Sequence, residues 1–370
     1  MITHGSNPDM EQVRQSDLDF HLGSREDYDL YAMRQACRAY PIDDVDFFCF
    51  QKSPPEVFAG ELLRKFCRFG DKEIEFDLAL KPGKLHRTLR TVNRDYFLMA
   101  DDVPFAFAFR DRRTNDYARI FHTKSPIPVY QYHRHRSMKA IIHPLKGYHE
   151  YPAKNIPPTR DTVPLSEKKP RVFWRGNLAG VTETSRGEMS FLSVVSDEEL
   201  GTEEKQEILR KSLRYTLSER SFNDDRLDVG LVLARKETDS PRSFAVSNVS
   251  RPRATIAEHF DHRYLLTLDG YDGPSSWYWM LNSNSVVIRQ KSDWLMFGDS
   301  YFIPWVHYVP MADDGSDLTD VFDWCERNLG ACEKISRNAR AAWAVLFDEG
   351  YQAERRRNIM SEYRQWFGKP

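Results

Sequence analysis

Polar residues suited to holding a phosphorylated ligand gather at three junctions in the second half of the 370-residue chain. They are Arg175-Gly176-Asn177, Asp269-Gly270 followed by Ser275-Ser276, and Asn282-Ser283-Asn284-Ser285. Glycine lets a backbone approach a ligand closely, helix N-termini offer free N–H groups, and arginine neutralises phosphate charge. Together the junctions predict a cradle for a nucleotide diphosphate, whereas each one alone is explained as well by a helix cap or a turn.

A carboxylate follows a short apolar run in the first half of the chain. Residues 103–109, VPFAFAF, are expected to form a buried strand that ends at Arg110-Asp111 and points toward a cleft. An aspartate in that place can take a proton from a hydroxyl group. The alternative is a carboxylate that caps the next turn or pairs with a neighbouring arginine.

Two prolines bracket a Trp, a His and a Tyr in the segment PWVHYVP, residues 304–310. Because each proline fixes its own φ angle, we expect a rigid extended segment that presents His307 and Tyr308 to a ligand in the cleft. A buried loop with a hydrogen-bonded histidine explains the same residues equally well.

Two patterns that suggest metal binding have a simpler explanation. His133-Arg134-His135 and His143 are interleaved with arginines, which would repel a cation. Asp44-Val45-Asp46 matches a D-x-D pattern, but no nucleotide-binding βαβ pattern precedes it, and it is expected to start a helix or turn. We therefore expect no metal ligands.

The composition limits the classes of partner. With 53 basic and 55 acidic residues, the chain has a net charge of −2 and lacks the basic footprint of a nucleic-acid-binding protein. Five cysteines without a C-x-x-C pair predict a reducing compartment rather than a disulfide framework. The N-terminus does not read as an export signal, and no apolar run approaches the ~18 residues of a membrane span. A cytoplasmic protein is expected.

Two further features bear on partners. Aromatic residues make up 13% of the chain, which suits packing against sugar rings, although a ring-rich core is the favoured explanation. The basic stretch with Lys81, Lys84, His86, Arg87 and Arg90 could contact a lipid-linked acceptor or the inner face of the membrane. A solvated face is the favoured alternative there.

The elements that must position these residues are expected to form two α/β domains. Residues 1–20 are a frayed tail, and residues 21–150 are an N-terminal domain that carries Asp111. Five prolines predict an interdomain connection at 151–170. Residues 171–348 alternate strands with helices, which predicts a doubly wound parallel sheet that binds ligands beyond the carboxyl ends of its strands. A final helix at 349–370 is expected to pack on the N-terminal domain.

Hydrophobic spacing gives the expected elements. In the first domain, helices are predicted over 27–40 and 55–69, and strands around 74–80, 103–109 and 127–132. In the second domain, strands are predicted at 171–174, 263–268 and 285–289, and helices at 202–221, 277–282, 317–328, 331–347 and 351–366.

The order of the motifs is similar to that of the CAP10-like glycosyltransferases, family 90. FWRGN (173–177) is followed by Arg186, HRYLLTLDG (262–270), SNSVV (283–287), and PWVHYVP with Asp317-Leu318 after it. The resemblance extends over about residues 100–345. The family includes protein O-glucosyltransferases, fungal capsule xylosyltransferases and bacterial lipopolysaccharide-core enzymes.

The resemblance implies a GT-B fold, in which two Rossmann-like domains face a central cleft. It also implies inverting, metal-independent transfer of a hexose or xylose from a UDP-sugar to a hydroxyl of a glycan or lipid-linked oligosaccharide. Lipopolysaccharide-core or other surface-glycan synthesis is the expected setting, with no cofactor beyond the donor substrate. A protein O-glycosyltransferase and an inactive glycan-binding protein on the same fold are the alternatives. A glycoside hydrolase would need two opposed carboxylates.

The resemblance assigns roles to single residues. Asp111 matches the catalytic base that ends an N-x-R-D strand, with Ala108 in place of the family asparagine. Ser276 stands where eukaryotic members carry a diphosphate-binding arginine, so Arg175 or Arg186 is expected to supply that charge. The implied donor-binding residues are Arg175, Gly176, Asn177, Arg186, Asp269, Gly270, Ser275, Ser276, Asn282, Ser283 and Ser285. The run DGYDGPSS (269–276) is more similar to bacterial members.

Overall fold

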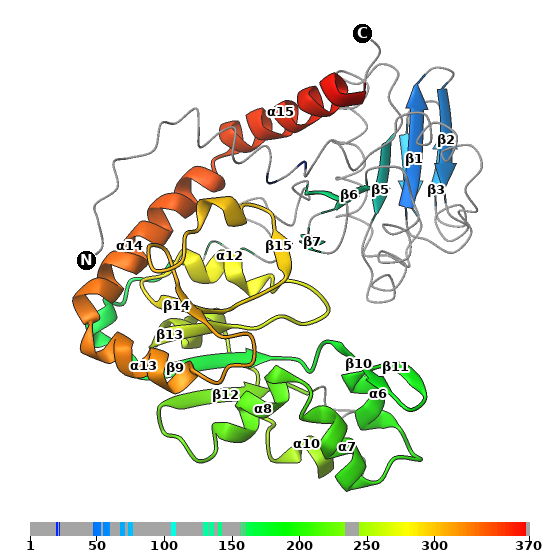
Figure 1. Ribbon diagram of the computed structural model, residues 1–370. Helices are drawn as coiled ribbons and strands as arrows, with labels where there is room; N and C mark the ends of the chain where they lie inside the picture. The colour runs from blue at the N-terminus through cyan, green and yellow to red at the C-terminus, as the bar shows by residue number, and fades with distance from the viewer. Residues whose placement is uncertain are drawn as a thin grey trace. The chain divides into compact units, whose positions relative to one another are not determined.

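The computed structural model describes residues 20, 22, 47–52, 55–59, 67–70, 73–76, 105–108, 129–131, 133–136, 140–142, 156, 158, 160–233 and 244–367. The chain divides into two compact units (Figure 1). Unit 1 comprises Met1–Ile156, Leu295–Tyr301 and Leu346–Pro370, and unit 2 comprises Pro157–Trp294 and Phe302–Val345. Two later stretches of the chain thus belong to the same unit as the N-terminal half.

Unit 1 contains a five-stranded mixed sheet in the order β2-β1-β5-β6-β8. Its strands are β1 (Phe47–Lys52), β2 (Pro55–Ala59), β5 (Phe105–Ala108), β6 (Val129–Gln131) and β8 (Ala140–Ile142). β1 is antiparallel to β2 and β5, whereas β5, β6 and β8 are parallel. The unit also holds the hairpin of β3 (Cys67–Gly70) and β4 (Glu73–Phe76), the pair β7 (His133–His135) and β15 (Trp294–Met296), the short helix η4 (Asp299–Tyr301), and α15 (Glu349–Phe367).

The predicted helix over 55–69 is wrong. Residues 55–59 form β2, which pairs with β1 in the register Cys49↔Phe58, and residues 67–70 form β3. Pairing with a neighbouring strand outweighs helical spacing in so short a segment. The strands predicted at 103–109 and 127–132 are confirmed as β5 and β6. The predicted helix 27–40 and, apart from Phe20, the predicted tail lie outside the described residues.

Unit 2 is built on a five-stranded sheet in which every neighbouring pair is parallel. The strands are β9 (Lys169–Gly176), β12 (Leu227–Leu231), β13 (His262–Thr267), β14 (Val286–Gln290) and β16 (Val309–Met311), in the order β12-β9-β13-β14-β16. The middle of β13 and β14 is buried on both faces, as parallel strands covered by helices require. The predicted parallel sheet is confirmed.

Alternate residues of these strands form the main core of unit 2. Val172, Tyr264, Leu266, Val286 and Ile288 share one face and are essentially buried. The helices that contribute to this core are α6 (Phe191–Ser196), α7 (Thr202–Leu209), α8 (Leu213–Arg220), α10 (Phe244–Ser247), α13 (Leu318–Arg327) and α14 (Leu329–Leu346). The short helix η2 (Leu165–Glu167) precedes β9.

The other face of the sheet carries α11 (Ile256–Phe260) and α12 (Ser276–Leu281). The ring of Phe173 in β9 stacks on His262 at 4.0 Å and meets His259 of α11 edge-on at 4.8 Å. Helices therefore cover both faces of the sheet. None of the helices in the described part of the chain is long and apolar enough to cross a lipid bilayer.

The helix predicted over 202–221 is two helices, α7 and α8. Ser212 interrupts them with an extended backbone, at φ −91° and ψ 119°. The break turns the second helix so that Tyr215 and Leu217 reach the core. The predicted helices near 277–282, 317–328, 331–347 and 351–366 are confirmed within two residues as α12 to α15.

The strand order defines a topological switch point. If the five strands are numbered along the chain, their order across the sheet is 2-1-3-4-5. The chain passes from β9 to β12 on one side of β9 and then to β13 on its other side. Sheets of this kind bind ligands outside the carboxyl ends of the two strands at the switch. In unit 2 these are β9 and β13, and Figure 1 shows the chain leaving β9 for the hairpin β10 (Val181–Thr184) and β11 (Gly187–Ser190).

Candidate functional site

An arginine that sequence reasoning missed joins the two strand ends at the switch point. Arg214 of α8 donates from Nη1 to the carbonyl oxygen and Oδ1 of Asn177, at 2.8 and 3.0 Å. Its Nη2 and Nε donate to the carbonyl oxygens of Leu268 and Asp269, both at 2.7 Å. One guanidinium therefore ties the chain after β9 to the chain after β13.

This guanidinium is enclosed by protein. Burial lowers the pKa of Arg214 to about 10, and the charges of Asp269 and Asp272 oppose that shift. The group stays protonated at neutral pH. The ring of Trp174 lies 5.4 Å from its central carbon. A fixed positive charge thus sits directly behind the strand ends, which favours an anionic ligand in front of them.

Gly270 is required by packing around Arg214. A Cβ atom on Gly270 would lie 2.9 Å from Arg214 Nη2 and 2.9 Å from the Cβ of Ala179. Its N–H group donates to the carbonyl oxygen of Asp272 at 3.0 Å. The sequence pattern predicts that this glycine lets a ligand approach, whereas in the structure its missing side chain leaves space for the Arg214 guanidinium.

Asp269 is a buried carboxyl group at the same place. Its N–H donates to Gln290 Oε1 at 3.0 Å, and its Oδ2 accepts a hydrogen bond from Ser292 Oγ. Burial raises its pKa to about 6, although the Ser292 hydrogen bond and the charges of Arg289 and Arg214 oppose the shift. The carboxyl therefore connects the end of β13 to the end of β14.

Arg175 lies at the end of β9, but its guanidinium is already paired. Nη2 lies 2.6 Å from Asp228 Oδ1, Nη1 donates to the Asp228 carbonyl oxygen at 2.8 Å, and the group stacks on Phe173 at 4.4 Å. Arg175 is opposite Gly230 in the sheet, and Asp228 is two residues earlier in β12. The guanidinium therefore reaches back over the sheet rather than beyond its carboxyl edge.

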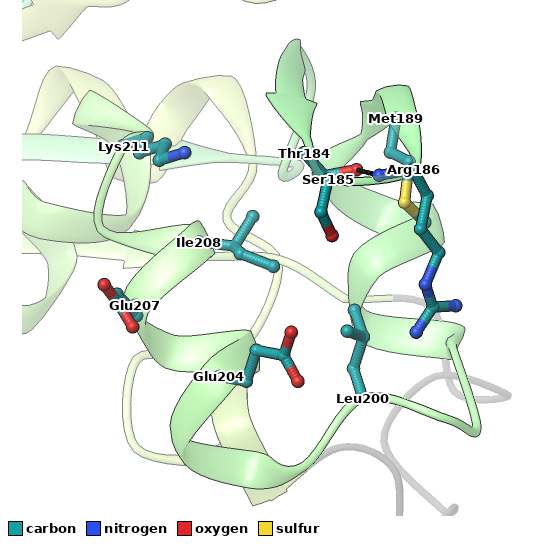
Figure 2. A pocket seen from close by; sticks show the side chains of 9 residues that line it. All are labelled: Thr184, Ser185, Arg186, Met189, Leu200, Glu204, Glu207, Ile208 and Lys211. Atoms are coloured by element: carbon teal, nitrogen blue, oxygen red, sulfur yellow. Dashed lines mark hydrogen bonds between the residues drawn. The ribbon is translucent and has the colours of Figure 1, made fainter.

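Arg186 lies in the turn between β10 and β11, where it is 41% exposed. It forms ion pairs with Asp197 at 3.1 Å and Glu199 at 3.0 Å. It also lines a pocket of about 180 Å³ between the hairpin and α7, as Figure 2 shows. The other lining residues are Thr184, Ser185, Met189, Leu200, Glu204, Glu207, Ile208 and Lys211. The ion pairs of the Arg186 side chain go to Asp197 and Glu199, and the structure does not bring it together with Arg214, Asn177 and Asp269 at the switch point.

Ser275 and Ser276 start α12, on the loop that follows the carboxyl end of β13. Ser275 has a helical backbone and makes no capping hydrogen bond through its side chain. One residue further on, the Trp277 ring packs against the guanidinium of Arg289 at 4.3 Å. The two serines therefore lie in the loop that leaves the switch point.

Asn282, Ser283 and Ser285 precede β14 and lie at the amino edge of the sheet, away from the carboxyl ends. The Ser283 hydroxyl donates to the Met280 carbonyl oxygen at 2.6 Å, and that of Ser285 donates to the His262 carbonyl oxygen at 2.7 Å. Their observed contacts shape the turn between α12 and β14. The structure does not bring these residues together with Asp269 and Gly270.

His307 and Tyr308 also precede a strand, β16, and the segment around them is a turn rather than the predicted extended segment. The Trp305 N–H donates to the Tyr308 carbonyl oxygen at 2.7 Å, and Trp305 has a φ of +63°. The prolines fix their own φ angles but leave Trp305 free to close the turn. His307 Nδ1 accepts from the Ile303 N–H at 2.9 Å, and burial lowers the pKa of this histidine.

The predicted base Asp111 and its neighbour Arg110 lie outside the described residues, as do Asp44-Val45-Asp46 and His143. Of the histidines weighed as metal ligands, His133 is buried in β7 and His135 is half-buried. Within the part of the chain that is described, no group of three or more His, Cys, Asp or Glu side chains is placed to hold a metal ion.

Arg289 and Arg214, which no sequence pattern singled out, differ in how visible they are in the sequence. Arg289 interrupts the buried apolar run of β14, and a charge inside such a run could have been noticed. Arg214 gave no usable signal, because its partners include three main-chain carbonyl groups far away in sequence.

A parallel sheet of this order, with polar strand ends joined at the switch point, defines a doubly wound α/β protein, a class whose ligands generally bind at the carboxyl edge of the sheet. Residues 86–345 match the model of glycosyl transferase family 90. Because this match covers more than half of the chain, the protein belongs to glycosyl transferase family 90, and the predicted family is confirmed.

Several proteins share shorter stretches with the chain. O-glucosyltransferase LpsA of Dichelobacter nodosus is 30% identical over 123 residues, which cover 32% of this chain and 35% of LpsA. Protein O-glucosyltransferase 3 of Homo sapiens is 25% identical over 83 residues, which cover 22% of this chain and 16% of that protein. Uncharacterized protein 035R of Invertebrate iridescent virus 3 is 36% identical over 69 residues, 19% of this chain and 6% of its own length. The matched parts thus span about a third of LpsA and less of the other two.

Proposed function

We propose that this protein transfers a sugar from a UDP-sugar to a hydroxyl group of a glycan acceptor, with inversion at the anomeric carbon and without a metal ion. The observation that carries the proposal is that one family match, over residues 86–345, spans both Asp111 and the switch point with Asn177, Asp269 and Gly270. In this proposal unit 2 is the donor-binding half of a GT-B enzyme, and unit 1 carries the base.

The donor is proposed to be UDP-glucose in the first instance. The two relatives whose names state an activity are O-glucosyltransferases, which supports glucose over galactose or xylose as the transferred sugar. The UDP group comes from the family resemblance. The acceptor is proposed to be a surface glycan or a lipid-linked oligosaccharide, as in lipopolysaccharide-core synthesis.

The diphosphate is proposed to lie in front of the strand ends that Arg214 joins. The buried guanidinium contributes a positive field there, and four of its five N–H groups already donate to Asn177, Leu268 and Asp269. At most one Nη2 N–H is left for a ligand. Arg175 and Arg186 remain the candidates for direct contact. Each is paired with a carboxylate, so a diphosphate would have to share or replace Asp228, or Asp197 and Glu199.

The chemical step then has a balanced form. Asp111 takes the proton of the acceptor hydroxyl, and the acceptor oxygen forms a bond to C1 of the sugar. The bond from C1 to the diphosphate oxygen breaks, and its electron pair leaves with UDP. Because attack and departure occur on opposite faces, the configuration at C1 inverts. Positive charge near the leaving diphosphate lowers the barrier.

The relatives also favour a second acceptor class. The match to a human protein O-glucosyltransferase supports a serine or threonine hydroxyl of a protein as the acceptor of the same reaction. A glycan-binding protein without catalysis would share the fold, and it would bind the donor or the glycan without releasing UDP.

Release of UDP from UDP-glucose tests the reaction without knowledge of the acceptor, because water replaces the hydroxyl slowly. We expect Asp111→Asn to lower the rate at least a hundredfold, since general-base catalysis contributes about 10²–10⁴. UDP affinity should stay within a few fold. Asp116→Asn, in the same sequence segment, is the matched control and should keep its rate. Equal rates for wild type and Asp111→Asn would show that Asp111 is not the catalytic base.

A further inference from the structure

Four successive apolar residues are exposed in the turn before β16. Ile303, Trp305 and Val306 are 54%, 48% and 39% exposed, and Pro304 between them is also exposed. We call residues 303–306 the apolar tip. Large side chains of this kind normally point into a core, so a run of them at the surface needs an explanation.

The conformation of the apolar tip is fixed by hydrogen bonds at its base. The N–H groups of Val306 and His307 donate to the Ile303 carbonyl oxygen at 3.1 and 2.9 Å, and the Ile303 N–H donates to His307 Nδ1 at 2.9 Å. The side chain of Asn338 in α14 donates to the Val306 carbonyl oxygen at 3.1 Å. His307, predicted to face a ligand, instead holds the tip.

Trp305 adopts a conformation that costs energy. Its φ of +63° is the one positive φ of a non-glycine among the described residues. A bulky residue in the left-handed region costs about 1–3 kcal/mol, and such strain concentrates where a side chain must point in a set direction. Glycine or asparagine would adopt this backbone more easily, yet this strained position carries an exposed indole ring.

Basic residues lie on the two helices that contact the apolar tip. The Trp305 ring packs edge-on against Trp324 of α13 at 4.8 Å, and Arg327 lies one turn further along that helix. Lys334 lies one turn before Asn338 in α14, and Arg337 is adjacent to Asn338. Arg327, Lys334 and Arg337 are exposed, and so are the acidic residues Asp320 and Glu333 on the neighbouring turns. A third carboxylate, Asp323, is 46% exposed, but its charge is balanced by an ion pair with Arg226 at 3.1 Å.

We propose that the apolar tip inserts into the surface of a lipid bilayer that contains anionic lipids. Tryptophan favours the level of the lipid headgroups, where its ring is buried and its N–H stays hydrated. Exposed isoleucine and valine beside it add apolar area to insert, and lysine and arginine at the rim meet anionic headgroups. The three cations outnumber the two carboxylates, which matches the charge of such a surface.

The size of the apolar tip favours a bilayer over a protein partner. A stable interface between proteins takes about 20–30 residues from each side, and four successive residues fall far short of that. A bilayer needs no complementary pocket and accepts a protruding tip. The inference does not depend on the proposed function, since it concerns where the protein sits and not which sugar it transfers.

Co-sedimentation of the full chain with vesicles tests the inference. Vesicles of phosphatidylcholine with 30% phosphatidylglycerol should bind the wild-type protein at lipid concentrations on the order of millimolar, because a tip this small anchors weakly. Trp305→Asn keeps a residue that tolerates the left-handed backbone and should weaken binding about tenfold. Vesicles of phosphatidylcholine alone, or 0.5 M salt, should also weaken it.

Phe222→Ser is the matched control, because Phe222 is 50% exposed on unit 2 outside the tip, and it should bind as the wild type does. No binding of the wild type at up to about 10 mM lipid, or equal binding of Trp305→Asn, would overturn the inference. Sedimentation velocity separates a further outcome. A dimer that Trp305→Asn dissociates, without vesicle binding, would show that the tip meets a second copy of the chain and would also overturn it.

Discussion

Burial of the Asp269 carboxyl makes its contribution to stability depend on pH. Burial raises its pKa from an ordinary 3.8 to about 6 in the folded protein. Between these two values the folded state binds more protons than the unfolded state, so unfolding becomes easier as pH rises. The stability from the protonated carboxyl is complete below about pH 4 and is lost as pH rises through 6.

Asp269→Asn should remove this dependence. A shift of about 2 pKa units corresponds to roughly 3 kcal/mol, so the wild type should lose that much relative to the variant between pH 4 and pH 7. Urea unfolding of both proteins at several pH values measures the difference. Asp197→Asn is the control. The backbone hydrogen bond from Glu199 lowers the pKa of Asp197 in the folded protein, so this carboxylate stabilises the fold at higher pH and its contribution is lost as pH falls. If the free energy of unfolding depends on pH in the same way for the wild type and Asp269→Asn, the raised pKa of Asp269 is contradicted.

Single residues also show what sequence reasoning can and cannot find. The patterns around Asn177, Asp269 and Gly270 were recognisable because strand, turn and helix signals follow one another locally. Arg175 was also recognised, but its pairing with Asp228 was not, because the two residues meet only when β9 and β12 align. Side-chain partners across a sheet depend on register, which one sequence does not reveal.

At the scale of elements, the switch point depends on how closely α8 approaches the ends of β9 and β13. Arg214 fits there only because Gly270 has no side chain. A helix thus holds two loops in place through one charged group rather than through an apolar contact. Loops fixed in this way can keep a binding geometry without a ligand.

Gly270→Ala should therefore disturb both packing and the loops. The added methyl group would meet Arg214 and Ala179, and overpacking of this kind costs about 1–3 kcal/mol. Gly201→Ala is the matched control, because a Cβ there would lie in open space and its φ is −67°. It should change the free energy of unfolding by less than about 1 kcal/mol. Equal urea midpoints for the two variants would show that a side chain at position 270 fits beside Arg214 without cost.

The elements of unit 2 were more predictable than those of unit 1. The central strands β13 and β14 are apolar runs, and α13 and α14 have clear apolar faces, so predicted and observed bounds agree closely there. Strand β12 was not predicted, because Asp228 and Gly230 interrupt its apolar residues. The break at Ser212 was missed because both flanking segments keep helical spacing. Residues 55–59 were misjudged because their structure comes from pairing with β1, and residues 67–69 because they pair with β4, which local spacing does not report.

At the scale of the whole molecule, each of the two units is built from stretches that are not contiguous in the sequence. Leu295–Tyr301 and Leu346–Pro370 belong to unit 1, although the rest of the second half forms unit 2. The α/β class and the parallel sheet could be predicted from the alternation of strands and helices. The last helix is expected to pack on the first domain, but the membership of residues 295–301 in unit 1 could not be predicted. It depends on contacts between residues far apart in the sequence, such as the pairing of β15 with β7.

A binding experiment tests directly whether a UDP-sugar is held at the carboxyl ends of β9 and β13, as proposed. Calorimetric titration with UDP and UDP-glucose, with and without EDTA, measures it in the wild type, Gly270→Ala and Gly201→Ala, each first shown to be folded. We expect saturable binding that EDTA does not change, at least tenfold weaker in Gly270→Ala and equal in Gly201→Ala. Absence of UDP binding in the wild type, or equal affinity in Gly270→Ala, would contradict the account.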